Sequence, residues 1–483
     1  MNIRFFLLAT LLLAPWGAAQ GDDTSKLKRP NIVLILVDDM GWSDLGCYGA
    51  DLHETPQLDQ LASDGVRFTN AYAMPVCSPT RAALMTGRHA ARVHMTIWSE
   101  GALRGPLDQK LLQGESLHSL PHSETTLAKH LQDSGYLTAL VGKWHLGDSD
   151  HYPETHGFDI NIGGTRWGAP QTFWWPYRGS GRFGSEFRYV PHLDFGEPGE
   201  YLTDRLTNEA LQVIEHAGDQ PFFLYLSHHA PHTPIEAKPD DVAYFAAKLR
   251  PELNHQNAVY AGMIKSIDQS VGRVLAKLKE RGLDKNTILV FASDNGGYIG
   301  IDQRAGQTVP ATNNAPLRSG KGSCYEGGVR VPLIVHWPSV TIPATTCTEP
   351  VVIMDLFPTL LGAAGLKPPA DTILDGLDLT PLLKDPTAQL ERDALYFHYP
   401  HYYPTTTPVS AIRAGDWKLL EYLEDDRIEL FNLGMDLGET TNIAEKQPAL
   451  VNELRERLHR WRAETGASMP QANPAYKERD ASP

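Results

Sequence analysis

The segment that most constrains the fold is residues 31–37, which read NIVLILV and contain no charged side chain. An aliphatic run of this kind is typical of a β-strand buried on both faces, which requires helices on both sides of its sheet. Strand-like and helix-like segments then alternate along the chain. Strands are expected at residues 138–141, 222–226, 287–292 and 331–337, and helices at 127–133, 203–216, 258–281 and 351–364. This order predicts an α/β fold with a large mixed, mostly parallel sheet flanked by helices.

The pattern changes after about residue 385, so we expect a main domain over residues 28–384. Short strand-like segments joined by tight turns occupy residues 394–399, 410–413, 417–422 and 427–433, and a helical segment follows at 449–465. They predict a smaller C-terminal subdomain over residues 385–468, with an antiparallel sheet and one helix. Residues 469–483 are polar and contain proline, which favours a flexible tail.

The first twenty residues are typical of a signal peptide. Arg4 precedes an apolar run at 5–14, and the small residues Gly17, Ala18 and Ala19 suit cleavage. A buried N-terminal helix is the alternative, but charged residues follow at once. No later stretch is apolar enough for a transmembrane helix, so no stable membrane anchor is expected. The sequence contains no Asn-x-Ser/Thr sequon, which favours a bacterial periplasmic or secreted protein.

The charge balance excludes one class of partner. The chain has 43 Lys and Arg against 58 Asp and Glu, a net charge of -15. A nucleic-acid-binding protein is therefore not expected. A polyanionic substrate would have to be bound by a local cationic pocket. The four cysteines (Cys47, Cys77, Cys324 and Cys347) match no zinc-binding spacing and are too few for a disulfide framework.

Acidic and amide side chains follow two of the expected strands. Asp38 and Asp39 come directly after the first strand, and Asp294 and Asn295 follow the strand near residue 290. Ligands of open α/β sheets bind at the carboxyl ends of the strands, where such side chains converge. Four oxygen donors with three negative charges suit a hard dication, Ca²⁺ more readily than Zn²⁺. The alternative is that each acid only caps the helix or turn that follows it.

The segment at residues 77–88 reads CSPTRAALMTGR and contains a cysteine in an unusual position. Pro79 and the helix formers after it indicate a helix start, and Gly87 indicates its end. Cys77 then lies at a helix N-terminus, where free N–H groups favour an anion. Arg81 lies one turn further on and can reach the same place.

Together these residues resemble the type I sulfatases of the alkaline-phosphatase-like superfamily. The shared motifs are CSPTR…TGR at 77–88, GKWHLG at 142–147 and GKGSCYEGGVRVP at 320–332, and the resemblance covers nearly the whole mature chain. It implies that residues 28–384 are the sulfatase catalytic domain. It also implies that a maturation enzyme, of the formylglycine-generating or the anaerobic type, converts Cys77 to Cα-formylglycine. The hydrated aldehyde is the nucleophile in that family, and it can expel sulfate by re-forming the aldehyde, which a serine could not do.

The resemblance also implies a role for each motif residue. Asp38, Asp39, Asp294, Asn295 and modified Cys77 would bind Ca²⁺. Arg81 would hold the formylglycine hydroxyl, and His145 would act as base on the diol. Lys143 and Lys321 would bind the sulfate, and His232 would protonate the departing oxygen. His228 and His229 match less well, and a core role for them stays open. Glu326 and Arg330 are interpreted as anchors of the loop that carries Lys321.

Residues 166–192 are expected to form a long loop rich in aromatic and arginine side chains. Aromatic rings stack on sugars and arginines pair with anionic groups, so Trp167 and Arg178 are candidate substrate contacts. A second aromatic patch spans residues 398–403. The alternative is that these aromatics pack under their own loops. Together they favour a sulfated saccharide, such as a glycosaminoglycan or algal polysaccharide fragment, as the substrate.

Two other functions are compatible with parts of the sequence. The first is a phosphonate or phosphate monoester hydrolase of the same superfamily. Phosphatases of that superfamily usually carry Thr or Ser with a zinc pair, and Cys77 and the absence of a second histidine-rich metal set in the sequence argue against them. Only a substrate assay separates the phosphonate hydrolase from a sulfatase. The second is a non-catalytic sugar-binding protein, which would follow if Cys77 stays unmodified.

Overall fold

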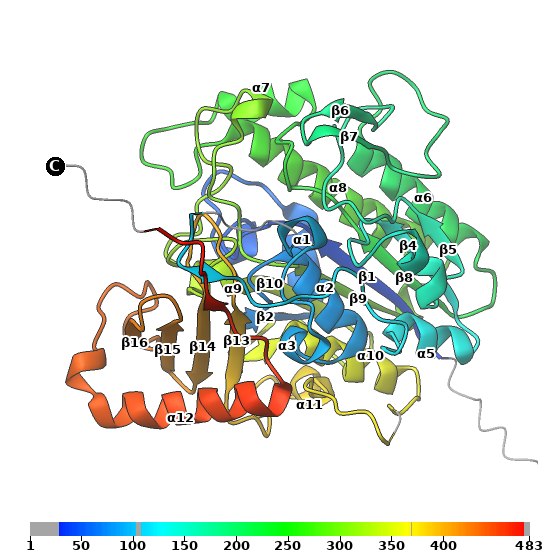
Figure 1. Ribbon diagram of the computed structural model, residues 1–483. Helices are drawn as coiled ribbons and strands as arrows, with labels where there is room; N and C mark the ends of the chain where they lie inside the picture. The colour runs from blue at the N-terminus through cyan, green and yellow to red at the C-terminus, as the bar shows by residue number, and fades with distance from the viewer. Residues whose placement is uncertain (1–28, 103–107, 369, 478–483) are drawn as a thin grey trace, which may run out of the picture.

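The computed structural model describes residues 29–102, 108–368 and 370–477. The expected signal peptide at residues 1–20 lies outside this part of the chain. A nine-stranded mixed sheet forms its centre (Figure 1). The strand order is β11 (Thr345–Cys347), β2 (Val66–Tyr72), β10 (Arg330–His336), β9 (Thr287–Ser293), β1 (Asn31–Val37), β8 (Phe222–Ser227), β4 (Leu137–Gly142) and β5 (Ile160–Ile162), and β12 (Val351–Val352) pairs with β2.

The central strand β1 is buried along its whole length, as its sequence predicts. It pairs in parallel with β8 on one side and β9 on the other. β4 extends the parallel array beyond β8. Only β10 runs against its neighbours, because it is antiparallel to both β9 and β2. The prediction of a mixed, mostly parallel sheet is therefore confirmed.

Helices cover both faces of the sheet. Side chains of Val33 and Ile35 pack on one face with α1 (Pro56–Asp64), α6 (Leu202–His216) and α8 (Ala258–Glu280). The alternate side chains of β1 face the second layer. That layer contains α2 (Cys77–Thr86), α5 (Leu127–Asp133), α10 (Leu356–Ala363) and α11 (Thr380–Lys384). The main domain also contains α3 (Ala90–Val93), α4 (Ser99–Ala102), α7 (Pro239–Ala246) and α9 (Glu326–Val329).

The C-terminal region forms a separate antiparallel sheet with a covering helix (Figure 1). Its strands are β13 (Leu395–Tyr399), β14 (Val409–Ala414), β15 (Trp417–Tyr422) and β16 (Ile428–Asn432), and the helix is α12 (Pro448–Thr465). Leu454 and Leu458 of α12 pack on one face of this sheet. The other face packs on the main domain through a second apolar cluster that includes Tyr72 and Phe397. Both predicted features of this subdomain, the sheet and the helix, are present.

Three segments differ from what the sequence predicts. The helix expected at 351–364 begins as strand β12, because Val351 and Val352 pair with β2 before the chain turns into α10. The loop at 166–192 contains a hairpin of β6 (Gly179–Gly181) and β7 (Gly184–Arg188). The tail expected to be flexible is held in its described part, since β17 (Gln471–Ala472) pairs with β3 (Leu111–Leu112).

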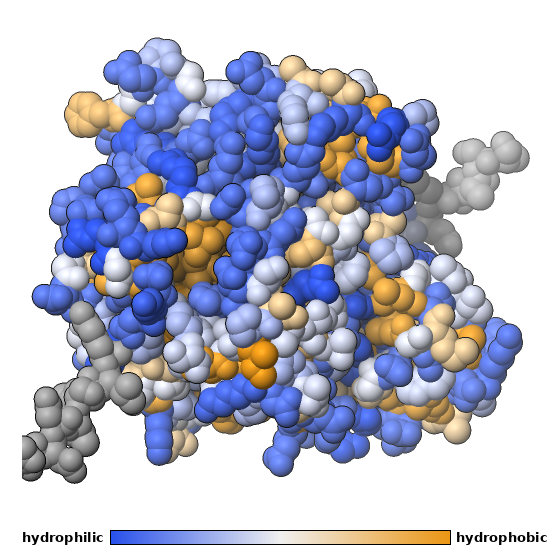
Figure 2. Space-filling model, turned by 180° about the vertical axis from the view of Figure 1, so that it is seen from behind, coloured by the Kyte–Doolittle hydropathy of each residue, from blue (hydrophilic) through white to orange (hydrophobic). Residues whose placement is uncertain are grey.

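The surface is mostly hydrophilic on the face opposite that of Figure 1, where apolar side chains lie in small areas between polar ones (Figure 2). Of the helices that the structure describes, none combines the length and apolar character that crossing a membrane would require.

Candidate active site

Four neighbouring parallel strands bring the candidate residues to one edge of the sheet. In the order β9, β1, β8 and β4, they are followed by Asp294–Asn295, Asp38–Asp39, residues 228–232 and Lys143. The carboxyl ends of these strands point the same way, so side chains separated by more than 250 residues meet there. Helix α2 adds Cys77 and Arg81 from its first two turns.

The carboxylates form a compact cluster of oxygen donors. Donor atoms of Asp38, Cys77 and Asp294 lie within 4.8 Å of one another. Asn295 joins the cluster by donating a hydrogen bond of 2.8 Å from Nδ2 to Asp39 Oδ1. Two further oxygens, Asp38 Oδ1 and Asn295 Oδ1, are buried without a hydrogen-bond partner. Orphaned buried acceptors are costly, and here they belong to the oxygen ligands that a hard dication prefers. The residues present therefore fit a calcium ion.

Cys77 lies at the first position of α2 with only 3% of its surface exposed. Its Sγ is 3.3 Å from His145 Nδ1, and Ser78 Oγ donates to the carbonyl of His145. Burial alone would raise the pKa of the thiol, but the positive charges of Lys143, His145 and Lys321 outweigh it and lower that pKa. This position thus favours an anionic or strongly polarised group.

Arg81 is fully buried and is held on three sides. Its Nε and Nη2 donate to Asp294 Oδ2 at 3.0 and 2.8 Å. Its Nη1 donates to Ser227 Oγ and to the carbonyl of Lys143. These bonds connect α2 to the ends of β9, β8 and β4, so Arg81 orients Asp294 in the carboxylate cluster. The sequence indicated a role at Cys77 only, and the bonds to Asp294 and Ser227 come from the tertiary structure.

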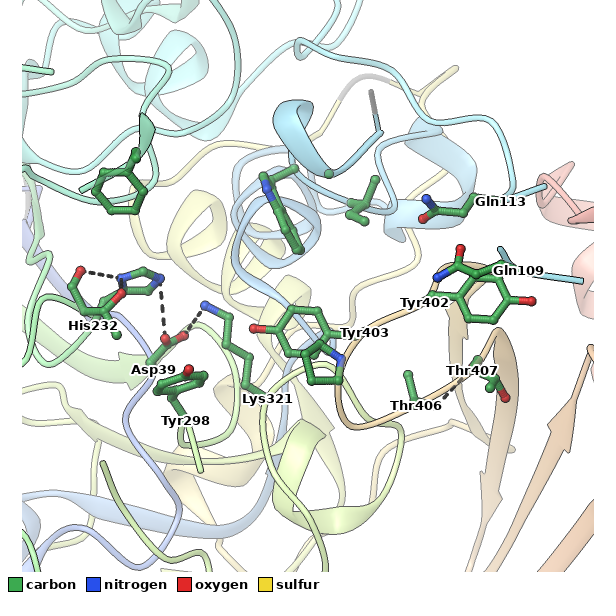
Figure 3. A pocket seen from close by; sticks show the side chains of 16 residues that line it. Asp39, Gln109, Gln113, His232, Tyr298, Lys321, Tyr402, Tyr403, Thr406 and Thr407 are labelled. Atoms are coloured by element: carbon green, nitrogen blue, oxygen red, sulfur yellow. Dashed lines mark hydrogen bonds and ion pairs between the residues drawn. The ribbon is translucent and has the colours of Figure 1, made fainter. Parts of the chain in front are cut away.

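Two lysines lie against the carboxylates. Lys143 Nζ contacts Asp38 Oδ2, and both side chains are fully buried. Lys321 Nζ is 2.6 Å from Asp39 Oδ1 (Figure 3). Burial would lower the pKa of Lys321, but the Asp39 carboxylate outweighs it and raises that pKa well above its usual value. Lys321 is therefore held as a cation, and both lysines lie close enough to Cys77 to act on its charge, so an anion can bind there.

The three histidines after β8 occupy different places. His232 Nδ1 donates to the carbonyl of Thr233, which leaves Nε2 facing Asp39 Oδ2 at 3.5 Å (Figure 3). Its pKa is lowered mainly by burial. His228 bonds to Ser270 on α8 and lies in the core. His229 is buried with neither ring nitrogen in a hydrogen bond, and burial lowers its pKa far below the usual value.

Two site residues have an unusual backbone conformation, and one glycine lies very close to a site side chain. Asp39 and His145 have left-handed backbones with φ of 67° and 61°, which are uncommon outside glycine and cluster at functional sites. The loop after β5 covers His145, because the carbonyl of Thr165 accepts its N–H. A Cβ at Gly168 would lie 2.3 Å from the His145 ring. Sequence reasoning missed Gly168, and a single glycine in an aperiodic loop gives no signal for such a contact.

Cys77 opens into a pocket of about 190 Å³ that adjoins a larger one of about 980 Å³. His232, Lys321, Trp98, Phe183 and Tyr403 line both. Glu100 and Arg188 line the smaller pocket and pair with each other at 3.4 Å. Glu100 also lies 3.8 Å from His145 Nε2. Sequence reasoning did not single out Trp98, Glu100 or Phe183, because they have no motif around them.

Trp167 and Arg178, the two predicted saccharide contacts, lie outside the pockets next to Cys77. Trp167 donates from Nε1 to Glu186 and packs edge-on against Tyr189. Arg178 is exposed. Neither residue lines the two pockets next to Cys77. Of the patch at 398–403, Tyr402 and Tyr403 reach the larger pocket, whereas His398 and His401 are buried in hydrogen bonds.

The loop of Lys321 is anchored as its sequence suggests. Glu326 Oε2 accepts from Tyr72 OH at 2.7 Å and pairs with Arg330 at 3.3 Å. Its Oε1 pairs with Lys418 of β15 at 2.7 Å. This fully buried network attaches the loop to the C-terminal sheet.

The assembled groups can bind and polarise one small tetrahedral anion. Lys143, Lys321 and His145 surround Cys77, and the carboxylate cluster lies beside them with its free oxygens. Preorganised charges in a buried site stabilise the charge that develops on an ester during its cleavage. The smaller pocket at Cys77 shares lining residues with the 980 Å³ cavity, so the two adjoin. This shape admits an anion attached to a larger molecule.

Comparisons with known proteins agree with this site. The sulfatase family matches residues 30–366, and the C-terminal region of N-sulphoglucosamine sulphohydrolase matches residues 320–464. N-acetylgalactosamine-6-sulfatase of Rattus norvegicus is 35% identical over 434 residues, which cover 86% of this chain and 76% of that protein. A sulfatase of Formosa agariphila is 31% identical and is covered to 92%, with 94% of this chain aligned.

Among solved structures, Ps i-CgsB in complex with k-i-k-neocarrahexaose has a TM-score of 0.76 and 30% sequence identity. The match covers 94% of this chain and 95% of that one. The family match spans most of the chain, and the matched range includes the residues that meet around Cys77. The chain therefore belongs to the sulfatase family of the alkaline-phosphatase-like superfamily and is an enzyme that hydrolyses sulfate esters.

Proposed function

We propose that this enzyme removes O-sulfate from a sulfated saccharide, with Cys77 matured to formylglycine and with Ca²⁺ bound by the adjacent carboxylates. One observation carries the proposal: Cys77 is the point on which the basic side chains of Lys143, His145 and Lys321 and the oxygen cluster of Asp38 and Asp294 converge. A thiol needs no such surroundings, whereas a nucleophile that attacks a sulfate ester does.

Calcium would be held by Asp38, Asp39, Asp294 and Asn295, with residue 77 completing the set. The orphaned oxygens of Asp38 and Asn295 support this assignment. When present, the aldehyde hydrate supplies a nucleophilic hydroxyl and the cation supplies a Lewis acid that lowers its pKa. Arg81 keeps Asp294 in place through its two bonds to Oδ2.

The remaining basic residues of the site neutralise the sulfate group or transfer protons during the reaction. Lys143 and Lys321 neutralise the sulfate oxygens, because both ammonium groups lie beside Cys77 in a buried site. His145, 3.3 Å from the Cys77 side chain, is placed to accept a proton from a hydroxyl carried there. His232 presents Nε2 to the pocket, and in its protonated form it would donate the proton on this nitrogen to the departing ester oxygen.

A saccharide substrate is supported by the pocket and by the relatives. Trp98, Phe183, Tyr298 and Tyr403 line the larger pocket, and aromatic faces of this kind bind sugars. The rat relative is named N-acetylgalactosamine-6-sulfatase, and Ps i-CgsB was solved in complex with k-i-k-neocarrahexaose. A periplasmic or secreted location, with the maturation enzyme as a transient partner, agrees with the signal-peptide pattern at residues 1–20.

The test is hydrolysis of a panel of sulfated saccharides, a phosphonate monoester and an aryl sulfate by protein co-expressed with a maturation enzyme. We expect sulfate release from at least one saccharide and no turnover of any ester by Cys77→Ala. Intact mass would report the state of Cys77 in the same sample. Turnover of the phosphonate alone would refute the proposal. An unmodified, inactive protein that binds sugars would favour the non-catalytic alternative.

A further inference from the structure

A second group of metal-ligating side chains consists of Asp44, His53 and His255. All three are buried, and one donor atom of each lies within 4.8 Å of the other two. Asp44 lies in the loop after β1, His53 lies just before α1, and His255 lies just before α8. We infer that these side chains bind Zn²⁺ or a similar transition-metal dication, at a site separate from that of calcium. The inference does not depend on the proposed function.

The donor atoms of this group favour zinc over calcium. The carboxylate cluster beside Cys77 offers oxygen ligands, which calcium prefers. Here two imidazoles and one carboxylate come together. Zinc binds imidazole nitrogen and carboxylate oxygen at about 2.0–2.2 Å, and two histidines with one carboxylate are an established zinc ligand set. The nitrogen donors therefore select a different kind of ion from the one expected at Asp38.

The spacing of the donor atoms matches ligands that share one ion. Two atoms bound to the same tetrahedral zinc lie about 3.4 Å apart. Asp44 Oδ1 is 3.2 Å from His255 Nε2 and 3.6 Å from His53 Nδ1. The two imidazole rings have centroids 4.4 Å apart. The carbonyl oxygen of Asp44 lies 3.0 Å from His53 Nδ1 and can supply a fourth ligand.

The direction of His255 Nε2 is that of a ligand rather than of a hydrogen-bonding group. This nitrogen is buried and has no hydrogen-bond partner among the residues that the structure describes, although Asp44 Oδ1 is only 3.2 Å away. At such a distance a hydrogen bond fails only when the nitrogen does not point at the oxygen. Ligands of one metal ion have this relation, because each of them points at the ion. A bound ion would also remove the cost of an unpartnered buried nitrogen.

The opposite nitrogen of His255 is held by a carboxylate. Nδ1 donates to Asp51 Oδ1 at 2.7 Å, and the backbone N–H of His255 donates to the same oxygen at 3.1 Å. Metal-bound histidines almost always donate their second ring N–H to such a group, which orients the ring and leaves the first nitrogen as a lone pair. The Asp51 side chain is 27% exposed, so the site lies just below the surface.

A proton on His255 is the alternative to a metal ion. Burial would lower the pKa of His255, but Asp44 and Asp51 outweigh it and raise that pKa. The same two carboxylates attract a dication, and their two negative charges balance it fully. An imidazolium balances only one of them. Metal binding would release this proton, so the two occupants compete directly.

The bonds of Asp44 indicate what the ion would stabilise. Asp44 Oδ2 accepts the N–H of Gly41 at 2.6 Å and the hydroxyl of Tyr260 at 2.7 Å. The Tyr260 hydroxyl also lies 3.2 Å from the carbonyl of Asp39. A metal at Asp44 would therefore fix the loop that carries the calcium ligands to the segments before α1 and α8. Its role would be structural.

The experiment uses untagged Cys77→Ala protein in saturating CaCl₂, so that the active-site thiol is absent and calcium fills the carboxylate cluster. Equilibrium dialysis against ZnCl₂ followed by elemental analysis should give one zinc per chain. Zinc at a hundredfold excess over Kd should raise Tm by about 3 °C. CoCl₂ should give the strong visible absorption of a tetrahedral site rather than the weak absorption of an octahedral one.

Variants of the ligands assign the binding to this site. His53→Gln and His255→Gln, made in the Cys77→Ala protein, should each weaken zinc binding by at least about a hundredfold, because each removes a ligand. Asp51→Asn should weaken it by about tenfold, because it alters only the support of His255. His216→Gln is the matched control, since His216 is exposed on α6. Circular dichroism of each variant shows that it is folded before its zinc is measured.

Two results would overturn the zinc site. One is a Cys77→Ala protein that retains no zinc and has the same Tm with and without ZnCl₂, which would leave His255 as an imidazolium between two carboxylates. The other is zinc bound with equal affinity by His255→Gln, Asp51→Asn and His216→Gln. Should His255→Gln fail to fold, the comparison of Asp51→Asn with His216→Gln decides. Sulfate release by the matured enzyme is measured separately, so failure of either proposal leaves the other standing.

Discussion

At the scale of single residues, the carboxylate cluster is the part of the site whose chemistry is most sharply defined. Asp38 binds Lys143 through one carboxylate oxygen and leaves the other without a partner. Asn295 donates from its amide nitrogen to Asp39 and leaves its amide oxygen without a partner. Without a cation, two buried acceptors would remain unsatisfied, at a cost of about 1–3 kcal/mol each. A bound dication removes that cost, so ion binding and stability are linked.

Calcium should therefore stabilise the folded protein even when Cys77 is unmodified. At a hundredfold excess over Kd the gain is about 2.7 kcal/mol, or about 3 °C in Tm for a chain of this size. Asp38→Asn should weaken the binding by about tenfold or more, because it removes one negative ligand. Differential scanning fluorimetry with CaCl₂ and with EGTA measures both effects, and Asp148→Asn at an exposed position is the control. Equal Tm values in CaCl₂ and EGTA for the wild type would contradict the calcium assignment.

At the scale of elements, loops position the site as much as strands do. The carboxyl ends of β1, β4, β8 and β9 supply the charged residues, but the loop after β5 covers His145. That loop approaches with backbone rather than side chains, because Gly168 has no Cβ to contact the ring. The prominent residue of the loop in the sequence, Trp167, packs instead against its own hairpin.

Gly168→Ala tests this close approach. The added methyl group would displace His145 or the loop, and a shift of about 1 Å in a reacting group can cost about a hundredfold in rate. We expect kcat/KM to fall by about 10- to 100-fold, with a change in Tm of only a few degrees. Gly362→Ala, at an exposed helical position with open space around it, should leave both unchanged. Full activity of Gly168→Ala would show that the loop yields without moving His145.

At the scale of the whole molecule, the two sheets are joined by buried polar contacts as well as by apolar packing. Lys418 of β15 bonds to Glu326, and Tyr72 of β2 bonds to the same carboxylate. His89 makes a second connection, because its Nε2 donates to the carbonyl of Tyr396 on β13. Its Nδ1 accepts the N–H of Ala91, so this imidazole has to be neutral in the folded chain.

His89 should make stability depend on pH. Burial lowers its pKa to about 4 in the folded protein, whereas the unfolded chain takes up the proton near pH 6.5. The unfolded state therefore binds more protons between pH 6.5 and 4, and the free energy of unfolding falls as pH decreases through this window. One such group contributes up to about 1.4 kcal/mol per pH unit.

Urea unfolding at pH 7, 6 and 5 measures this dependence. Asparagine can accept the same N–H without titrating, so His89→Asn should reduce the slope by about 1 kcal/mol per pH unit. His216→Asn, at an exposed position on α6, serves for comparison. An unchanged slope in His89→Asn would assign the acid sensitivity to other buried groups.

The sequence by itself determined the strands, the main helices and the residues that follow the strands. Those features depend on patterns of neighbouring residues, such as the aliphatic run of β1 and the helix start at Cys77, and such patterns are visible in the sequence itself. The same reasoning placed Asp38 and Asp294 together, since parallel strands end at one edge of a sheet, and the resemblance of the motifs to the sulfatases added Cys77.

Only the tertiary structure decided which side chains surround the substrate pocket. Trp98 and Gln109 line the same pocket as Tyr403 because the C-terminal subdomain packs against the main domain. Contacts between residues some 300 positions apart produce no periodic pattern in the sequence, so they could not be predicted from it. It also decided that the segment after α12 is held by β3, and that Arg178 points to solvent. The physical reason is the same in each case: the energy of these contacts belongs to surfaces that exist only after the chain has folded.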